Sequence, residues 1–280
     1  MTGTTAKDAA AATQLAGMPT LVGIRAAHHP TYDRIVFDFQ GGLPARHDLS
    51  YVPALIGDAS GLPVPVAGRA ILQVRFEPAQ AHTDEGTPTV PERVAFALPN
   101  IITAVRGGDF EGVTSFGIGL SERQPYTTLT LSNPYRVMID IKAAFRTVPR
   151  DVWYFAPDRF STGQEPYFVP VRRPVLPLTP AVGVLDRLFA GPTDGEKAQG
   201  LAFLASEATG FTGLSISQRV ARVQLTGGCN AGGSTASIAG EIFPALKQFT
   251  TVDWVKILDP EGGTERPTGL CDSIPFGLEP

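Results

Sequence analysis

Hydrophobic and polar residues alternate along the first half of the chain. In residues 34–40, the side chains of Ile35, Phe37 and Phe39 would all point to one side of an extended strand. A period of two residues is typical of an antiparallel strand with one buried face. Segments of the same kind occur at residues 21–27, 70–78, 94–99, 101–107, 113–120, 126–132 and 135–142. Eight or so strands with no helical period between them predict a sandwich or a barrel.

The periodicity changes after about residue 150. Two more strand-like segments come first, at residues 152–157 and 166–175, and the prolines of the second indicate an edge position. Thr179 then serves as an N-cap before Pro180, and the helix that follows is predicted to stop at Gly191. The apolar face of this helix consists of Ala181, Leu185, Leu188 and Phe189.

Two strands, a helix and a last strand complete the second half. The strands at residues 213–217 and 219–225 are joined by a tight turn at Gln218, and a second helix is predicted to begin near Ser234. Its apolar positions are Ile238, Ile242, Ala245, Leu246 and Phe249. The final strand, residues 252–258, is apolar on both faces and is expected inside its sheet. The order strand, helix, strand, strand, helix, strand predicts an α/β sandwich with helices on one face of a small sheet.

These patterns divide the chain into two domains joined by a short connection. We expect a disordered tether at residues 1–20, an all-β domain at residues 21–146 and an α/β domain at residues 150–280 with a Pro- and Gly-rich tail. A chain of 280 residues is long enough for two domains of ordinary size. Only residues 143–150 separate the two sets of strands. Because so short a connection limits relative motion, a fixed interface between the domains is expected.

Composition describes a foldable protein without a membrane-spanning segment. Hydrophobic residues make up 43% and charged residues 18% of the chain, and the mean hydropathy is +0.05. No apolar run approaches the roughly 18 residues that span a bilayer. The formal charge of −4 divides into −1 up to residue 149 (12 basic against 13 acidic residues) and −3 from residue 150 (11 against 14). Because the basic residues are scattered singly, no nucleic-acid partner is expected.

At residues 21–142 the sequence resembles the AMIN-like domain. The resemblance is carried by the segments YDRIVFDFQGGLPARHDLSYVP, GRAILQVRFEPAQAHT, GDFEGVTSFGIGLSE and LSNPYRVMIDI. It implies a β-sandwich of exported bacterial envelope proteins, related to modules that direct cell-wall enzymes to peptidoglycan. It transfers no catalytic residue to this chain.

At residues 151–258 the sequence resembles the GerMN domain. The resemblance is carried by VWYFAP, FVPVRRPV, LFAGPTDGEKAQGL, GLSIS, VARVQL and IAGEIFPALKQFTTVDWVKI. GerMN modules occur in exported proteins and lipoproteins of spore and cell envelopes, where they act in assembly. The two modules in this order resemble AMIN-like/GerMN lipoproteins of Gram-positive envelopes.

The two resemblances together imply a non-catalytic, extracytoplasmic protein of the cell envelope. Its expected partners are peptidoglycan or envelope proteins, and its expected role is assembly or scaffolding, with a homo-oligomer formed through the second domain. Residues 1–17 are not an intact signal peptide, so contact with a membrane is expected only through a lipid anchor preceding residue 1. The alternative is a hydrolase of wall glycans or peptides whose active-site residues are brought together only by the fold.

The chain has two cysteines, Cys229 and Cys271, and neither lies in a zinc-ligand or C-x-x-C spacing. From their spacing alone, a disulfide and two unrelated buried thiols both remain open. The resemblance to exported proteins implies an oxidising compartment, in which disulfides persist. It therefore favours a bridge between Cys229 and Cys271 that pins the tail to the second domain.

Glycine-rich segments are the first candidates for binding chemistry. Residues 226–235 lie between a strand and a helix, where phosphate-binding loops form, but they lack both the P-loop lysine and the G-x-G-x-x-G pattern. A flexible connection is the simpler interpretation. Gly117 and Gly119 form a bare G-x-G inside a strand pattern, which a bulge or close backbone packing explains.

Candidate catalytic and metal-binding residues are few. No G-x-S-x-G occurs, and the four histidines all lie in probable loops of the first domain: His28, His29, His47 and His82. His82, Asp84 and Glu85 could hold a cation weakly, but a solvated turn is the simpler interpretation. Asp109 and Glu111 are the best carboxylate pair for glycan hydrolysis, but a polar turn between strands is by far the better interpretation. We therefore predict no catalytic residue, no cofactor and no metal site.

Four tyrosines of the first domain are candidates for stacking on sugars, although aromatic residues in strands more often fill cores or pair across strands. They are Tyr32, Tyr51, Tyr126 and Tyr135.

Overall fold

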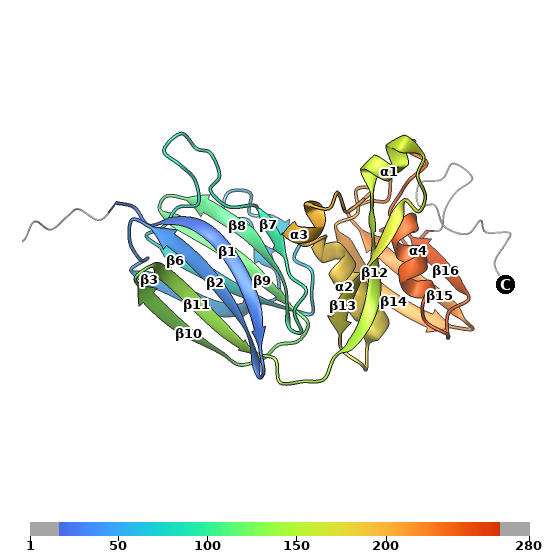
Figure 1. The fold of residues 1–280 in the computed structure, drawn as a ribbon, viewed down its shortest axis with the longest axis horizontal. Helices are drawn as coiled ribbons and strands as arrows, with labels where there is room; N and C mark the ends of the chain where they lie inside the picture. The colour runs from blue at the N-terminus through green and yellow to red at the C-terminus, as the bar shows by residue number, and fades with distance from the viewer. Residues whose placement is uncertain (1–16, 264–280) are drawn as a thin grey trace, which may run out of the picture.

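The computed structural model describes residues 17–263 as two units that lie side by side (Figure 1). The N-terminal sandwich comprises residues 20–142, and the C-terminal α/β unit comprises residues 148–263. Most of the predicted tether and the tail after residue 263 lie outside the described residues. In the part of the chain that the structure describes, no helix is long and apolar enough to cross a bilayer.

Two antiparallel sheets form the N-terminal sandwich. The first sheet has the order β1 (Thr20–His29), β2 (Tyr32–Gln40), β11 (Tyr135–Lys142) and β10 (Tyr126–Ser132). The second has the order β3 (Arg46–Val52), β6 (Ala70–Glu77), β9 (Val113–Leu120), β8 (Ile101–Phe110) and β7 (Arg93–Ala95). All the strands predicted from alternation are present, and Ile35, Phe37 and Phe39 lie in the core as predicted.

Aromatic rings from both sheets meet in the core of the sandwich. The ring centroid of Phe37 lies 4.9 Å from that of Phe76 and 5.7 Å from that of Phe116. The rings of Phe39 and Phe76 are 5.2 Å apart. Phe37 and Phe39 belong to the first sheet, whereas Phe76 and Phe116 belong to the second. These tilted and edge-on contacts therefore hold the sheets together.

One strand of the second sheet was not predicted. β3 pairs with β6 along its whole length, but it begins with the polar sequence Arg46, His47, Asp48. Only Leu49 and Tyr51 of this strand pack against the core. An alternation that includes two apolar residues is too short to be distinguished from a turn.

A separate segment, the strap (residues 53–69), crosses the outer face of the second sheet. Its two short strands are β4 (Leu55–Ile56) and β5 (Pro63–Val64). Gly117 and Gly119 of β9 lie beneath it. A Cβ atom at Gly117 would lie 2.9 Å from the Leu55 side chain, and one at Gly119 would clash with the carbonyl oxygen of Ala67. Close packing against the strap therefore accounts for the G-x-G pattern, as expected from the sequence.

The C-terminal α/β unit consists of a two-stranded ribbon, two main helices and a three-stranded sheet. The ribbon pairs β12 (Val148–Phe155) with β13 (Phe168–Val175), and the sheet has the order β14 (Gly210–Ser217), β15 (Val220–Thr226) and β16 (Trp254–Leu258). The main helices are α2 (Pro180–Ala190) and α4 (Ala239–Lys247), and the short helices are α1 (Pro157–Thr162) and α3 (Asp194–Lys197). The predicted order of strands and helices is present from β13 to β16.

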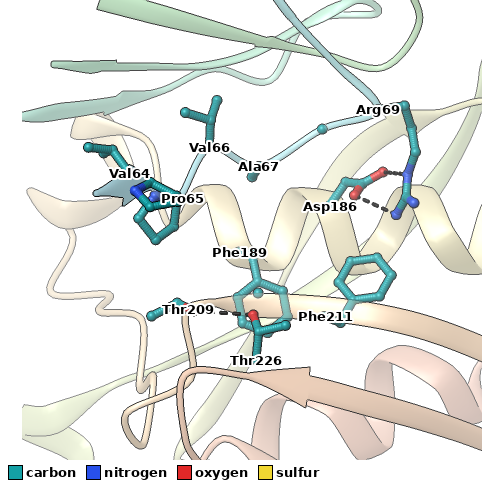
Figure 2. Close-up of a pocket in the computed structure, with 13 residues that line it drawn as sticks. Val64, Pro65, Val66, Ala67, Arg69, Asp186, Phe189, Thr209, Phe211 and Thr226 are labelled. Carbon is teal, nitrogen blue, oxygen red and sulfur yellow. Dashed lines mark hydrogen bonds and ion pairs between the residues drawn. The ribbon is translucent and has the colours of Figure 1, made fainter. Parts of the chain in front are cut away.

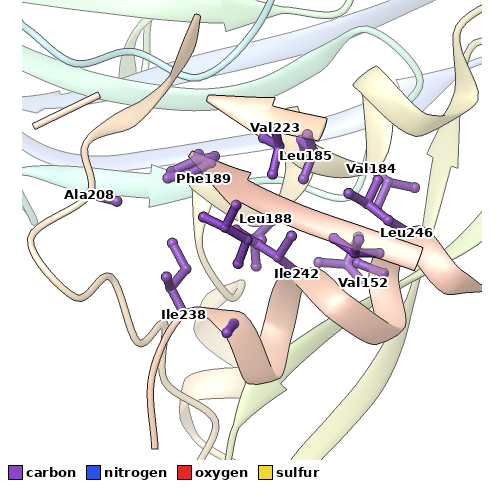
Figure 3. Close-up of a cluster of buried hydrophobic side chains, with 14 of the residues drawn as sticks. Val152, Val184, Leu185, Leu188, Phe189, Ala208, Val223, Ile238, Ile242 and Leu246 are labelled. Carbon is purple, nitrogen blue, oxygen red and sulfur yellow. The ribbon is translucent and has the colours of Figure 1, made fainter. Parts of the chain in front are cut away.

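Helices α2 and α4 lie between the ribbon and the sheet. Both helices contact β12, and they also contact β14 and β16 respectively. Their shared core includes Val152 from the ribbon, Leu185 and Ile242 from the helices, and Val223 from the sheet (Figure 3). The sequence predicted helices on one face of a single small sheet. In the structure the strands are divided between the ribbon and the three-stranded sheet, and the helices lie between the two.

Helix α2 follows its sequence signals more closely than α4 does. Helix α2 begins at Pro180 and ends before Gly191, as predicted. Helix α4 begins at Ala239, five residues later than predicted, because residues 234–238 form turns. In these turns the hydroxyls of Ser234 and Ser237 accept hydrogen bonds from backbone N–H groups two residues later.

Strand β16 differs from the prediction in its position. Among the described strands it pairs only with β15, in parallel, so it is an edge strand there rather than an internal one. Val255 and Ile257 are nevertheless buried, in the core that also contains Ile242 and Leu246 of α4. The helix thus buries one face of a strand that lies at the edge of the sheet.

Candidate functional site: an interdomain groove and an arginine-bearing sheet face

The side chain of Arg187 joins the two units. It extends from α2 and is buried. Its guanidinium donates hydrogen bonds to the carbonyl oxygens of Phe96 (3.2 Å), Leu98 (2.5 Å) and Pro99 (3.1 Å). A fourth bond, of 3.0 Å, reaches the hydroxyl of Ser121. Burial lowers the pKa of Arg187 to about 10, so the guanidinium remains charged at neutral pH.

A buried carboxylate holds the same loop from the other side. Asp33 of β2 is completely buried, and its carboxylate accepts hydrogen bonds from the backbone N–H groups of Asn100 (2.6 Å) and Ile101 (3.0 Å). The Nδ1 atom of His28 lies 2.7 Å from the same carboxylate. The loop before β8 is thus fixed by Asp33 within the sandwich and by Arg187 across the interface.

A groove opens between the strap and the α/β unit, beside this contact (Figure 2). Arg69 of the strap forms a bidentate ion pair with Asp186 of α2, with both N–O distances at 2.8 Å. The guanidinium carbon of Arg69 also lies 4.9 Å from the ring centroid of Phe211. The groove consists of two adjacent hollows of about 350 and 480 Å³, which share Pro65, Phe189 and Thr209.

Most polar groups of the groove already bind one another. Besides the Arg69–Asp186 pair, the hydroxyls of Thr209 and Thr226 lie 3.1 Å apart, and Arg93 donates to the carbonyl oxygen of Pro65 at 2.6 Å. A ligand would have to break these bonds before it gained polar contacts. The arrangement therefore serves primarily to hold the two units together.

The outer face of the first sheet offers more accessible polar groups. Its side chains form rows across the strands, because Asp38 is paired with Arg136, Arg34 with Asp140, and Tyr32 with Lys142. Arg25 of β1 and the exposed residues Leu129 and Leu131 of β10 extend the rows to both edges of the sheet.

Aspartates hold three arginines of this face in position. Asp38 accepts hydrogen bonds from Arg25 (2.8 and 3.1 Å) and from Arg136 (2.9 Å). Asp140 binds Arg34 through two contacts of 2.6 and 2.7 Å. We call these five residues the arginine face. Its three guanidinium groups exceed its two carboxylates, so the face has a net positive charge.

An aromatic pair adjoins the arginine face. The rings of His29 and Tyr32 are stacked with centroids 4.5 Å apart, and the guanidinium of Arg34 lies 5.4 Å from the Tyr32 centroid. A hollow of about 380 Å³ lies among the arginines, and another of about 540 Å³ lies beside Tyr32 and Lys142. Guanidinium groups bind carboxylates, and a tyrosine ring offers an apolar surface with a polar tip. The face thus suits a ligand that carries both carboxylates and rings.

The structure assigns His82 and Asp109 to a structural role. Asp109 lies 2.6 Å from Nδ1 of His82, and it accepts bonds from the backbone N–H of Ala81 (2.9 and 3.0 Å) and the hydroxyl of Thr114 (2.7 Å). These bonds attach the loop after β6 to the end of β8. Glu111 is exposed in the turn that follows β8. The polar turn between strands, which the sequence offered as the other interpretation of these two residues, is therefore present, and Asp109 anchors it.

The histidines are not brought together into a catalytic or metal-binding group. His28 and His29 end β1, His47 lies in β3, and His82 lies in a loop. Within residues 17–263, neither His28 nor His82 is hydrogen-bonded to a serine, threonine or cysteine side chain. In the same range, no three His, Cys, Asp or Glu side chains, including those of Asp84 and Glu85, are grouped as metal ligands would be.

Of the four candidate tyrosines, two serve the core. The hydroxyls of Tyr51 and Tyr126 donate to the carbonyl oxygens of Gln124 (2.5 Å) and Leu49 (3.0 Å), and both rings pack against the sandwich core. Tyr32 belongs to the outer face of the first sheet, and Tyr135 is exposed where β11 begins.

The cysteine bridge remains a prediction. Cys229 is buried in the core of the α/β unit, whereas Cys271 lies outside the described residues. The glycine-rich segment around Cys229 has a packing role. A Cβ atom at Gly227 would lie 2.7 Å from the carbonyl oxygen of Glu207.

Sequence reasoning missed the two charged residues that fix the interface loop. Asp33 occupies the inward-facing register of β2, two residues before Ile35, so the alternation itself marks a buried carboxylate. Arg187 has no such signal, because the surface it meets belongs to the other unit.

Comparison with protein families matches residues 19–143 to the AMIN-like domain. No similar protein is found among curated proteins, and no similar structure among solved ones. The matched range ends one residue after β11 and thus covers the whole N-terminal sandwich. Domains of this family are usually extracytoplasmic and associated with the cell envelope. The chain therefore contains an AMIN-like domain at residues 19–143, which suggests a peptidoglycan-binding or envelope-associated role.

Proposed function

We propose that this protein is a non-catalytic, extracytoplasmic component of the cell envelope that binds peptidoglycan through the arginine face of its AMIN-like domain. The observation that carries the proposal is the accessible cluster of Arg25, Arg34 and Arg136, which stand in three neighbouring rows of the sheet next to the stacked pair of His29 and Tyr32. Peptidoglycan offers both complementary groups, since its stem peptides carry carboxylates and its glycan strands consist of sugar rings.

The geometry of the ion pairs supports recognition of carboxylates. Asp38 and Asp140 fix the guanidinium planes before a ligand arrives, which lowers the entropy lost on binding. The side chain of Arg25 is 55% exposed and that of Arg136 is 33% exposed, so both retain donors for a second acceptor. Binding of this kind is electrostatic in part and should weaken as salt is added.

Co-sedimentation with purified peptidoglycan tests the proposal. The wild-type protein is expected in the pellet at low salt, and Arg25→Ala/Arg136→Ala is expected to bind about tenfold more weakly, equivalent to ~1.4 kcal/mol. Tyr32→Ala should weaken binding without changing its salt dependence, because it removes an uncharged contact.

Arg46→Ala is the matched control. Arg46 lies on β3 of the second sheet, pairs with Glu77 at 2.5 Å, and is exposed like Arg25. This variant should bind as the wild type does. A wild-type protein that stays in the supernatant at low salt contradicts peptidoglycan binding. Equal loss of binding in the control and the face variants contradicts the assignment to this face.

The same assay distinguishes a binding protein from the alternative, a wall hydrolase. A hydrolase would release soluble glycan or peptide fragments from peptidoglycan during incubation, whereas a binding protein leaves the pellet mass unchanged. Chromatography of the supernatant measures the fragments.

We propose an assembly role for residues 151–258, in line with their resemblance to the GerMN domain. The supporting observation is that Arg187 and the Arg69–Asp186 pair attach this unit firmly to the sandwich. A lipoprotein anchor preceding residue 1 belongs to the same proposal. Fractionation of cells that carry the native gene would place the protein with the membrane or wall fraction, and recovery in the cytoplasm would contradict it.

A further inference from the structure

Strand β10 forms an open edge of the first sheet. In the order β1-β2-β11-β10 it has one neighbour, and Figure 1 shows no described element beyond it. Every residue of the strand after Tyr126 is exposed. Leu129 and Leu131 are 45% and 43% exposed, although both are large and apolar. An open edge with exposed apolar side chains is a template for pairing with another strand.

The sequence of β10 lacks the usual protection of an edge strand. Natural edges are protected by charges, proline, glycine-containing bulges or short length. Among the described strands of five or more residues, β10 (YTTLTLS) is the one with no charged residue, glycine or proline. The other open edges of the two larger sheets are protected: β1 carries Arg25 and a bulge at Gly23, β3 carries Arg46 and Asp48, and β7 has three residues.

Strand β14 in the α/β unit is the nearest comparison. It is also uncharged and lies at an edge, but it contains Gly210 and Gly213 and has a register shift between Phe211 and Gly213. A bulge twists an edge away from flat pairing. The register of β10 against β11 is regular from Tyr126 to Ser132.

The backbone groups of β10 that face outward can be identified from its ladder. The N–H of Lys142 donates to the carbonyl oxygen of Pro125 at 3.0 Å, so this pair is a hydrogen-bonded one. Hydrogen-bonded and non-hydrogen-bonded pairs alternate along an antiparallel ladder. The odd-numbered residues of β10 therefore bond to β11. The outward-facing N–H and C=O groups belong to Tyr126, Thr128, Thr130 and Ser132.

We propose that β10 pairs in antiparallel fashion with β10 of a second copy of this chain, about a twofold axis at Leu129. In this register Thr128 opposes Thr130 of the second copy, and Tyr126 opposes Ser132. Outward-facing groups then meet only outward-facing groups, so about eight hydrogen bonds form across the seam. A register shifted by one residue would bring outward-facing residues opposite inward-facing ones.

The side chains on the outer face of the seam are self-complementary as well. Leu129 opposes its own copy on the axis, and Leu131 opposes Thr127. These neutral pairs place an apolar stripe, extended by Met138 of β11, across the joint. Pairs of β-branched and apolar residues are favourable across strands, and no like charges meet.

Pairing would join the first sheet of one copy to the first sheet of the other, which gives one continuous sheet of eight strands. The two arginine faces would then lie side by side on one surface, and a polymeric ligand could occupy both. Bivalent binding of that kind raises the apparent affinity without new contacts. The pairing itself does not depend on peptidoglycan and is measured without it, so failure of one proposal is distinguishable from failure of the other.

Sedimentation equilibrium of the purified chain at micromolar concentrations tests the pairing. The wild type is expected to show a reversible dimer. Leu129→Lys should be monomeric, because it places two like charges opposite each other on the axis. The matched control is Ser215→Lys, at an exposed position of β14, which should dimerise as the wild type does.

Cysteine cross-linking tests the register and does not depend on the lysine variant. Leu129→Cys should give a covalent dimer on mild oxidation, since opposing residues of a non-hydrogen-bonded pair lie about 4.5 Å apart between Cα atoms. Thr127→Cys should not, because it opposes residue 131 and lies about 13 Å from its own copy. The wild type gives the background from Cys229 and Cys271.

Three results would overturn the proposal. They are a wild type that stays monomeric throughout, a dimer that Ser215→Lys disrupts and Leu129→Lys does not, and equal cross-linking by the two cysteine variants. The second result would instead favour assembly through the α/β unit. A chain that stays monomeric on its own, even if its β10 pairs with a strand of another protein, would count as the first of these results and would overturn the proposal.

Discussion

At the scale of single residues, Glu241 combines burial with an incomplete set of hydrogen bonds. It lies on the α4 face that also carries Ala245, one turn after the N-cap residue Ile238, and it is completely buried. Its Oε1 atom accepts hydrogen bonds from the backbone N–H groups of Phe155 and Leu204, each at 3.1 Å. Its Oε2 atom has no hydrogen-bond partner among the described residues. Burial raises the pKa of this carboxyl to about 8, although the two N–H groups oppose the rise.

This raised pKa predicts that stability falls as pH rises. The folded chain keeps a proton on Glu241 up to about pH 8, whereas the unfolded chain releases it near the ordinary value of 4.5. Because the unfolded state binds fewer protons between these values, the free energy of unfolding should drop across that interval, by a few kcal/mol. Glu241→Gln keeps the accepting oxygen and does not titrate, so this decline should largely disappear.

Urea unfolding at several pH values measures the effect. Comparison of the variant with the wild type isolates Glu241 from other groups, such as Asp186, whose pKa is also raised by burial. Parallel pH profiles for the two proteins would contradict the assignment. Glu261→Gln is the control, because that side chain is exposed and its substitution should leave the profile unchanged.

Buried charges are visible in a sequence only where they interrupt a regular pattern. Asp33 and Glu241 occupy core positions of a strand and a helix, so their registers mark them as buried. Arg187 lies on a helix that is buried on nearly all sides, and its acceptors are about 90 residues away along the chain. No local pattern could have identified those acceptors, since three of them are backbone carbonyls in a loop and the fourth is the Ser121 hydroxyl, all in the other unit.

At the scale of elements, the strap explains why β9 contains two glycines. A side chain at residue 119 has no space, because the carbonyl oxygen of Ala67 occupies it. Gly119→Ala should therefore displace the strap and lower the free energy of unfolding by about 2 kcal/mol. The strap also carries Arg69, so the Arg69–Asp186 pair should weaken with it.

Chemical denaturation of Gly119→Ala measures this loss. The control is Gly213→Ala in β14, where a Cβ atom would meet nothing within 4 Å. That variant should be as stable as the wild type or slightly more stable, because alanine loses less backbone entropy than glycine on folding. Equal stability of all three proteins would mean that the strap moves freely away from β9.

Elements with a regular, one-sided pattern were predictable, and elements defined by distant contacts were not. The alternation in residues 34–40 gave β2 and its buried face, and Thr179, Pro180 and Gly191 gave the limits of α2. The interpretation failed at β3, which has two core residues, and at β16, where α4 supplies the burial. The arginine face was missed because each arginine sits singly in its strand, and only the sheet register brings three of them together.

At the scale of the whole molecule, the tail is expected to be tied to the α/β unit by a disulfide. Cys229 lies in the core of this unit, and Cys271 lies in the tail outside the described residues. A bridge between them would close a loop of about 40 residues, worth roughly 4 kcal/mol in the chain-entropy model. The intact mass should increase by two hydrogens on reduction. A mass that reduction leaves unchanged would rule the bridge out.

The short connection between the units was predicted to fix their orientation, and the structure contains the contacts that would do so. Residues 143–147 join β11 to β12, and two polar clusters, around Arg187 and around Arg69, bind the units together. The length of the connection between the two units could be predicted from the sequence. The partners of Arg187 and Arg69 could not be predicted, because they depend on how the two cores meet.

Arg187→Ala should lower the stability of the protein and also release the fixed orientation of its two units. The substitution leaves three carbonyl oxygens and the Ser121 hydroxyl without their donor, so the free energy of unfolding should fall by about 3 kcal/mol. In nuclear relaxation measurements the wild type should tumble as one body, and the variant should show shorter, separate correlation times for residues 20–142 and 148–263.

The control is Arg159→Ala, at an exposed position of α1, which should change neither the free energy of unfolding nor the correlation times. Independent tumbling of the wild type would contradict the fixed interface, and a variant that still tumbles as one body would transfer that role to the Arg69–Asp186 pair.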